Sequence, residues 1–181
     1  MADFQIACKK VLEDEGIFSD DANDRGGKTK YGITENVAKK HGYTTEMKDL
    51  PLDFAIEIYR LDYWNPLRLN FVNDQSLAEI LFQFGVNCGI GTACKSLQRA
   101  LNLLNRNNIS WIEAILDGIM GSQTLGIVNK LSKEDLKYTC GIVLGLQFER
   151  YVSIIERDSS QEDFTRGWVN RIVKYLKEVI L

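Results

Sequence analysis

Two carboxylates near the start of the chain, Glu15 and Asp24, have the residue types needed to cleave a glycosidic bond. They stand nine positions apart in the stretch EGIFSDDANDRGGKTKYGIT, which covers residues 15–34. Glycoside hydrolysis uses two carboxyl groups that flank the scissile bond: one protonates the leaving oxygen, and the other stabilises the sugar cation, activates water or attacks. Glu15 is therefore the candidate general acid and Asp24 the candidate supporting carboxylate.

The place of Glu15 on its helix favours the role of acid. Glu15 follows Phe4 by eleven positions, which at about 100° per residue brings the two side chains to within about 20° of one direction. We expect burial, the negative end of the helix and the neighbouring aspartates to raise the pKa of Glu15. A glutamic acid that is protonated near neutral pH is what a general acid requires. The alternative is a side chain that only reaches from the helix end into solvent.

The residues after Asp24 are suited to line a sugar-binding cleft. Gly26 and Gly27 permit a sharp turn, and hydroxyl side chains alternate along the short strand that follows, at Thr29, Tyr31 and Thr34. Ordinary strand residues are the alternative reading of all three. A calcium loop is disfavoured because the acidic run does not match the EF-hand spacing. We expect no metal and no cofactor.

The elements predicted to position these residues are mainly helices. Hydrophobic periodicity predicts a long helix that starts at the cap Asp3 and stops at Gly16, followed by a polar loop with a short strand or hairpin. Ser76 and Ser132 are the expected caps of later helices. The remaining helices are expected over 52–63, 76–86, 92–104, 123–131, 132–157 and 162–180. The predicted fold class is mainly α, with a small β-hairpin region near the N-terminus.

Composition and charge give no support for a nucleic-acid-binding or membrane-spanning protein. The 181 residues carry a formal net charge of −3, which gives no electrostatic footprint for nucleic acid. No apolar run approaches the roughly 20 residues of a membrane span, and charged residues interrupt positions 2–15, so we expect neither stable membrane insertion nor a signal peptide. The default expectation for the oligomeric state is a monomer.

The four cysteines, Cys8, Cys88, Cys94 and Cys140, form no CxxC pair. The single histidine, His41, disfavours both a Cys/His zinc site and a Cys–His nucleophile pair. The cysteines are therefore expected to be reduced residues of the core.

The opening stretch and four later segments together resemble the glycoside hydrolase family 108 N-acetylmuramidases. The family signature reads EGGY, a loop, then D-x-GG-x-T-x-(F/Y)-G-I-T, and this chain has EGIF in place of EGGY. The later segments follow in the family's order: DYWNPL (62–67), FQFGVNCGIGTACKSLQRAL (82–101), DGIMGSQT (117–124) and RGWVNRI (166–172).

The resemblance implies a lysozyme-like fold and cleavage of the β-1,4 bond between N-acetylmuramic acid and N-acetylglucosamine in peptidoglycan strands. It places the catalytic acid at Glu15, and the Glu/Asp/Thr order, similar to that of phage T4-type lysozymes, favours Asp24 and Thr29 as the supporting pair. It also implies a catalytic lobe over 1–90 and a helical peptidoglycan-binding-like lobe over 91–181, packed as one compact domain.

Three further residues are candidates to bind substrate. Tyr63 and Trp64 have rings that can stack on sugars, with core packing as the alternative. Asn87 lies in an apolar stretch, where it would either hydrogen-bond an N-acetyl group or cap the broken helix. The DGIMGSQT segment is expected to be a structural turn more than a separate binding site.

The expected role is that of a phage endolysin, made in the host cytoplasm and released to the periplasm and cell wall through a holin-type pore. A non-catalytic wall-binding module, a secretion or assembly helper and a lytic transglycosylase are the alternatives.

Overall fold

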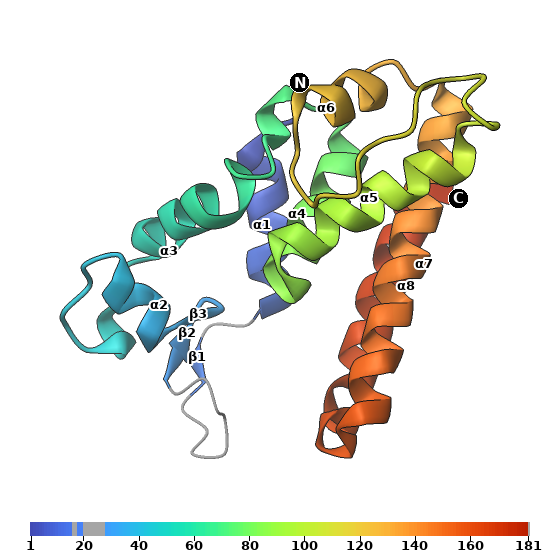
Figure 1. Ribbon diagram of the computed structural model, residues 1–181. Coiled ribbons are helices and arrows are strands. Elements are labelled where there is room, and N and C mark those ends of the chain that lie inside the picture. Colours follow the sequence, from blue (N-terminus) through green and yellow to red (C-terminus); the bar gives the residue numbers. More distant parts are fainter. Residues whose placement is uncertain (16–17, 20–27, 181) are drawn as a thin grey trace.

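The computed structural model describes residues 1–15, 18–19 and 28–180, and of residues 14, 15, 18, 19 and 180 it describes the backbone only. Helices dominate these ranges, and three two-residue strands lie near the N-terminus, so the expected fold class is confirmed (Figure 1). The α-helices are α1 (Phe4–Glu15), α2 (Glu35–Lys40), α3 (Leu52–Tyr59), α4 (Gln75–Cys88), α5 (Ile90–Leu104), α6 (Ser122–Val128), α7 (Lys133–Arg157) and α8 (Thr165–Ile180).

The strands form one small antiparallel sheet in the order β1 (Phe18–Ser19), β2 (Thr29–Lys30) and β3 (Ile33–Thr34). Strand β2 is central, with Thr29 opposite Thr34 in the hairpin that β2 makes with β3. Figure 1 shows the sheet beside α2, at the far end of α3 from α4.

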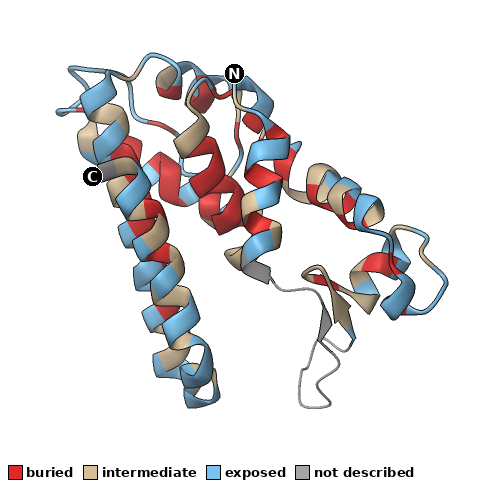
Figure 2. Ribbon diagram, turned by 180° about the vertical axis from the view of Figure 1, so that it is seen from behind, coloured by how far each residue is buried: buried red, intermediate tan, exposed pale blue. Residues whose placement is uncertain are grey.

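Helix α4 is the centre of the core. Every residue from Leu77 to Gly85 is buried on this helix, including the polar Glu79 and Gln83. Figure 2 shows buried residues along α4 and on the sides of α1 and α5, whereas the pair α7 and α8 extends from this core with mostly exposed outer faces. A helix that is buried on all sides must be surrounded by other helices, and α4 packs against α1, α5, α7 and α8.

Several element boundaries differ from the sequence-based expectations. Asp74, rather than Ser76, caps α4, because its carboxylate accepts the N–H of Leu77 at 2.8 Å. Helix α2 was not expected; it is a single short segment whose cap is Thr34. The expected cap Ser132 is confirmed, with its hydroxyl accepting the N–H of Asp135 at 3.0 Å. Short helices and caps are decided by local contacts that hydrophobic periodicity does not encode.

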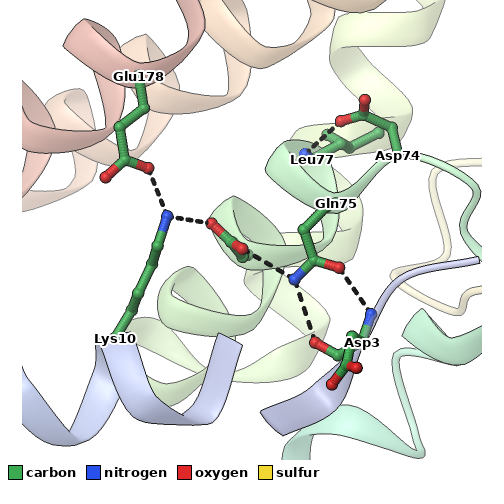
Figure 3. A network of polar contacts seen from close by, with 7 residues as sticks. Asp3, Lys10, Asp74, Gln75, Leu77 and Glu178 are labelled. Atoms are coloured by element: carbon green, nitrogen blue, oxygen red, sulfur yellow. Dashed lines mark hydrogen bonds and ion pairs between the residues drawn. The ribbon is translucent and has the colours of Figure 1, made fainter. Parts of the chain in front are cut away.

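A charged network fixes α1 against α4 and α8. The ammonium group of Lys10 on α1 lies 2.7 Å from Glu79 on α4 and 2.7 Å from Glu178 on α8 (Figure 3). Gln75 continues the network, since its amide donates to Glu79 at 2.8 Å and to the carbonyl of Asp3 at 3.1 Å. Burial alone would lower the pKa of Lys10, but its hydrogen bonds with the two glutamates outweigh that effect and raise the pKa. The ammonium group is thereby held in its charged form.

A second polar network, a ladder of side-chain amides, joins α4 to α7. The side-chain amides of Gln83 and Gln147 donate to each other at 2.6 and 2.9 Å, and Gln147 also donates to the hydroxyl of Tyr151 at 2.7 Å. Both glutamines are almost fully buried. Buried amides without partners are costly, so this ladder fixes the register between the two helices.

We expect Gln147→Leu to lower the free energy of unfolding by about 1–3 kcal/mol, because it leaves the buried Gln83 amide without its partner and removes one hydrogen bond from the Tyr151 hydroxyl. The double variant Gln83→Leu/Gln147→Leu should lose less than the sum of the two single changes, because it removes both members of the pair. Urea denaturation of the four proteins measures this coupling. Additive losses would show that the two amides act independently.

The cysteines behave as expected for reduced core residues. All four are free thiols; Cys8, Cys94 and Cys140 are buried and Cys88 is half-buried. Burial raises the pKa of Cys8 and Cys88 to about 11 and that of Cys94 and Cys140 to about 12.

At pH 8 the folded protein should therefore react very slowly with a disulfide reagent such as DTNB. With a pKa of about 11, only about one thiol in a thousand is the reactive thiolate at that pH. Absorbance at 412 nm should report four thiols in guanidinium chloride and almost none in buffer. Rapid reaction of a thiol in the folded protein would contradict the burial of these residues.

Candidate active site

Helix α1 carries the candidate acid at its last residue. Asp3 begins the helix, since its carboxylate accepts the N–H of Gln5 at 2.7 Å, and the helix ends at Glu15 as expected. Phe4, Cys8 and Val11 are buried on its inner face. The side chain of Glu15 and the whole of Asp24 lie outside the described residues, so their separation stays a matter of prediction.

The hairpin after Asp24 presents two hydroxyl side chains together. Thr29 and Thr34 are direct cross-strand neighbours, and such neighbours project from the same face of a sheet. Both are half-buried. The hydroxyl of Thr34 also caps α2 by accepting the N–H of Val37 at 3.4 Å, so one residue joins the hairpin to the helix that follows.

Tyr31 occupies the tight turn of this hairpin. It has a φ of 52° and Gly32 a φ of 74°, which is the left-handed geometry that two-residue hairpin turns require. A non-glycine residue seldom adopts this conformation, and here tertiary contact supports it: the buried Tyr59 of α3 donates its hydroxyl to the carbonyl of Tyr31 at 2.9 Å.

The half-buried Tyr31 is one wall of a mainly apolar pocket of about 410 Å³. The pocket lies between α1, the hairpin turn and α3, and is lined by Gln5, Cys8, Lys9, Leu12, Glu13, Tyr31, Leu52 and Ile56. Residues of α3 were not expected at the site. Their signal in the sequence is weak, because Leu52 and Ile56, four positions apart, look like ordinary core residues of an amphipathic helix.

The neighbouring aromatic residues Tyr63 and Trp64 differ in how deeply they are buried. They follow α3 in a π-helical turn, Arg60–Trp64, closed by the N–H of Asn65 donating to the carbonyl of Arg60 at 2.9 Å. Tyr63 is half-buried, with its ring centroid 6.0 Å from that of Tyr59.

The expected substrate contact of Trp64 is wrong. Its side chain is 2 % exposed, and its ring lies edge-to-face against Phe4 and Phe82, at centroid distances of 5.4 and 5.5 Å. The ring has no free face on which a sugar could stack. Core packing was the alternative reading of this residue, and the tertiary contacts decide in its favour.

Asn87 binds protein groups on both ends of its amide. Its amide nitrogen donates to the carbonyl of Gln83 at 2.7 Å, and its oxygen accepts a hydrogen bond from Arg171 of α8. These contacts join the last turn of α4 to α8. They account for the polar residue in an apolar stretch without a substrate, although the side chain is only half-buried.

The DGIMGSQT segment is organised around the buried Gln98 of α5. The Gln98 amide donates to the carboxylate of Asp117 at 2.8 Å and accepts the N–H of Gly118 at 2.9 Å. The hydrogen bond from Gln98, followed by that from Ile119, holds the pKa of Asp117 below its usual value. Gly118 has a φ of 76°, and a Cβ there would lie 2.9 Å from the carbonyl oxygen of Gly91. These contacts are those of a structural turn.

Two negative findings concern metals and membranes. Among the side chains that the structure describes, no three of His, Cys, Asp or Glu gather closely enough to hold a metal ion. Within residues 1–15, 18–19 and 28–180, no helix has the length and apolar character to cross a bilayer.

Comparison with known proteins gives two family matches. Residues 8–89 match the model of Glycosyl hydrolase 108, and residues 92–173 match that of a Predicted Peptidoglycan domain. The first match includes Glu15, Asp24 and the hairpin; the second includes α5 from its third residue, the Gln98-centred turn and α7.

A solved structure, that of Brucella abortus SagA, has the same fold with a TM-score of 0.73. The two sequences are 23% identical, over 98% of this chain and 93% of that one. No curated protein sequence matches.

We expect Tyr59→Phe to loosen the hairpin turn with little effect on the rest of the fold. Loss of the hydroxyl leaves the carbonyl of Tyr31 without its partner, at a cost of about 0.5–1.5 kcal/mol. Amide hydrogen exchange of residues 29–34 should become faster. The matched control is Tyr138→Phe, which removes an exposed hydroxyl that donates to Glu134 within α7; unchanged exchange in the hairpin of Tyr59→Phe would refute the role of Tyr59.

Proposed function

We propose that the protein is an N-acetylmuramidase, because residues 8–89 match the glycosyl hydrolase 108 model and residues 92–173 match that of a predicted peptidoglycan domain. It cleaves the β-1,4 bond between N-acetylmuramic acid and N-acetylglucosamine, with Glu15 as general acid. The family matches indicate a glycoside hydrolase that acts on peptidoglycan; the bond and the acid are our proposal.

The observation that carries this proposal is the position of Glu15 at the end of a firmly held helix. Lys10, five residues before Glu15, is bound by both Glu79 and Glu178. The backbone at the end of α1 is thereby fixed relative to the core. A general acid must be held in a defined place relative to the bond that it protonates, and this arrangement supplies the support.

In the proposed mechanism Glu15 protonates the glycosidic oxygen as the bond breaks. Asp24 stabilises the oxocarbenium-like state or the attacking water. Thr29 supports the same step with its hydroxyl, and Thr34, its cross-strand neighbour, binds the sugar on the same face of the sheet. Tyr31 and Tyr63 contribute ring faces on which sugars can stack. No cofactor takes part.

The proposed biological role is that of a phage endolysin, which reaches the cell wall through a holin-type pore. Holin and spanin genes beside the coding sequence would support this role. Secretion genes in their place would favour a helper that opens the wall locally for a secretion machine.

Purified peptidoglycan digested by the wild type should yield new reducing N-acetylmuramic ends, identified by mass spectrometry. Glu15→Gln should lose at least about a hundredfold in rate, because the amide is far too weak an acid to protonate the leaving oxygen. The matched control is Glu156→Gln, which makes the same change at an exposed position of α7 and should keep the wild-type rate.

Each other outcome points to a different conclusion. If Glu15→Gln cuts as fast as the wild type, the acid is another residue. Products with 1,6-anhydro ends would identify a lytic transglycosylase. If neither protein cuts any wall but both bind it, the chain is a wall-binding module.

A further inference from the structure

A polar groove crosses the surface between α5 and α7, within the predicted peptidoglycan domain. It consists of two adjoining hollows of about 500 and 200 Å³, which share Thr92, Ser96 and Arg99. These three residues lie at positions i, i+4 and i+7 and therefore follow one face of α5. On α7, Leu146, Arg150 and Ser153 have the same spacing and line the smaller hollow.

The two arginines of this groove, Arg99 and Arg150, form no ion pair with a carboxylate that the structure describes. Both are exposed. Glu149 lines the smaller hollow but is bound to neither arginine. Asp117, the acidic residue at the other end of the groove, is already held by Gln98 and Ile119. Arg99 and Arg150 therefore present their donors to solvent.

The start of α5 adds further positive character. The cap residue Gly89 supplies no side-chain hydrogen bond, and the first turn contains no acidic residue. The N–H groups of a first helical turn carry partial positive charge, and Gly91 and Thr92 of that turn line the larger hollow. Lys95 lies on the same side.

The chemistry of this lining selects carboxylates over sugars. Guanidinium groups bind carboxylates through paired, charge-assisted hydrogen bonds, and hydroxyls and helix N–H groups add donors. Sugar rings are recognised by stacking on aromatic side chains, and none lines either hollow. In peptidoglycan, the carboxylates are carried by the short peptides attached to N-acetylmuramic acid.

We propose that the groove between α5 and α7 binds the carboxylates of the peptidoglycan stem peptide through Arg99 and Arg150. The identity of the ligand rests on the proposed function, whereas the anion-binding character of the groove rests on its own residues. The groove holds a peptide while the candidate acid acts on the glycan strand to which that peptide is attached.

The test measures binding of the Glu15→Gln protein, which should not digest the wall, to purified sacculi freed of teichoic acids. The sacculi are used in native form and after carbodiimide amidation of their carboxylates. A second protein carries Arg99→Glu and Arg150→Glu in addition. The matched control carries Lys133→Glu and Lys177→Glu, the same change of charge at exposed sites outside the groove; Lys133 is about 25 Å from Arg150 along α7.

We expect the double arginine variant to bind native sacculi at least about tenfold more weakly, and the control to bind like its parent. Amidated sacculi should bind the parent about as weakly as native sacculi bind the arginine variant. Equal losses in the arginine variant and the control would overturn the groove assignment. Undiminished binding to amidated sacculi would overturn the carboxylate as the ligand, and would point instead to the sugars of the glycan strand.

The two proposals can fail separately. If the wild type cuts no wall but the arginine variant loses binding as expected, the groove assignment stands and the muramidase does not. If cleavage depends on Glu15 but binding is insensitive to Arg99 and Arg150, the muramidase assignment stands and the groove assignment does not. Circular dichroism of every variant must match the parent, and Arg99→Lys/Arg150→Lys, which keeps the charge, should recover part of the binding.

Discussion

The architecture depends on the polar groups buried on helix α4. Apolar burial drives the helices together but does not specify their register, because it is non-directional. Glu79 and Gln83 add direction: a buried carboxylate needs a cation and a buried amide needs matched donors and acceptors. Lys10 of α1 and Gln147 of α7 supply them, and Glu178 brings α8 to the same ammonium group (Figure 3).

This constraint reaches the candidate active site through α1. The helix that Lys10 holds in place is the one that ends at Glu15, so the requirement for charge pairing in the core also fixes the backbone of the proposed acid. The hairpin is held separately, by the hydroxyl of Tyr59 on the carbonyl of Tyr31. The two sides of the proposed cleft are thus supported by different parts of the core.

The C-terminal half of the chain carries a different kind of surface. Its DGIMGSQT turn is held by contacts within the protein, because Gln98 hydrogen-bonds Asp117 and Gly118. Arg99, one residue further along α5, lines the groove and forms no ion pair among the described residues. Adjacent residues of a helix point in directions about 100° apart. One helix therefore stabilises the turn on one side and offers donors to a ligand on the other.

The sequence by itself determined the mainly helical class, the end of α1 at Glu15 and the cap of α7 at Ser132, because periodicity and capping are local properties of the chain. Tertiary structure decided whether a given polar or aromatic side chain faces the core, a neighbouring helix or solvent. The sequence allows Trp64 to stack on a sugar, but its ring contacts with Phe4 and Phe82 place it in the core. Asn87 meets Arg171, a residue 84 positions away, and Arg99 shares a hollow with Arg150. Such pairings are set by how helices distant in the sequence pack together, which no local pattern encodes.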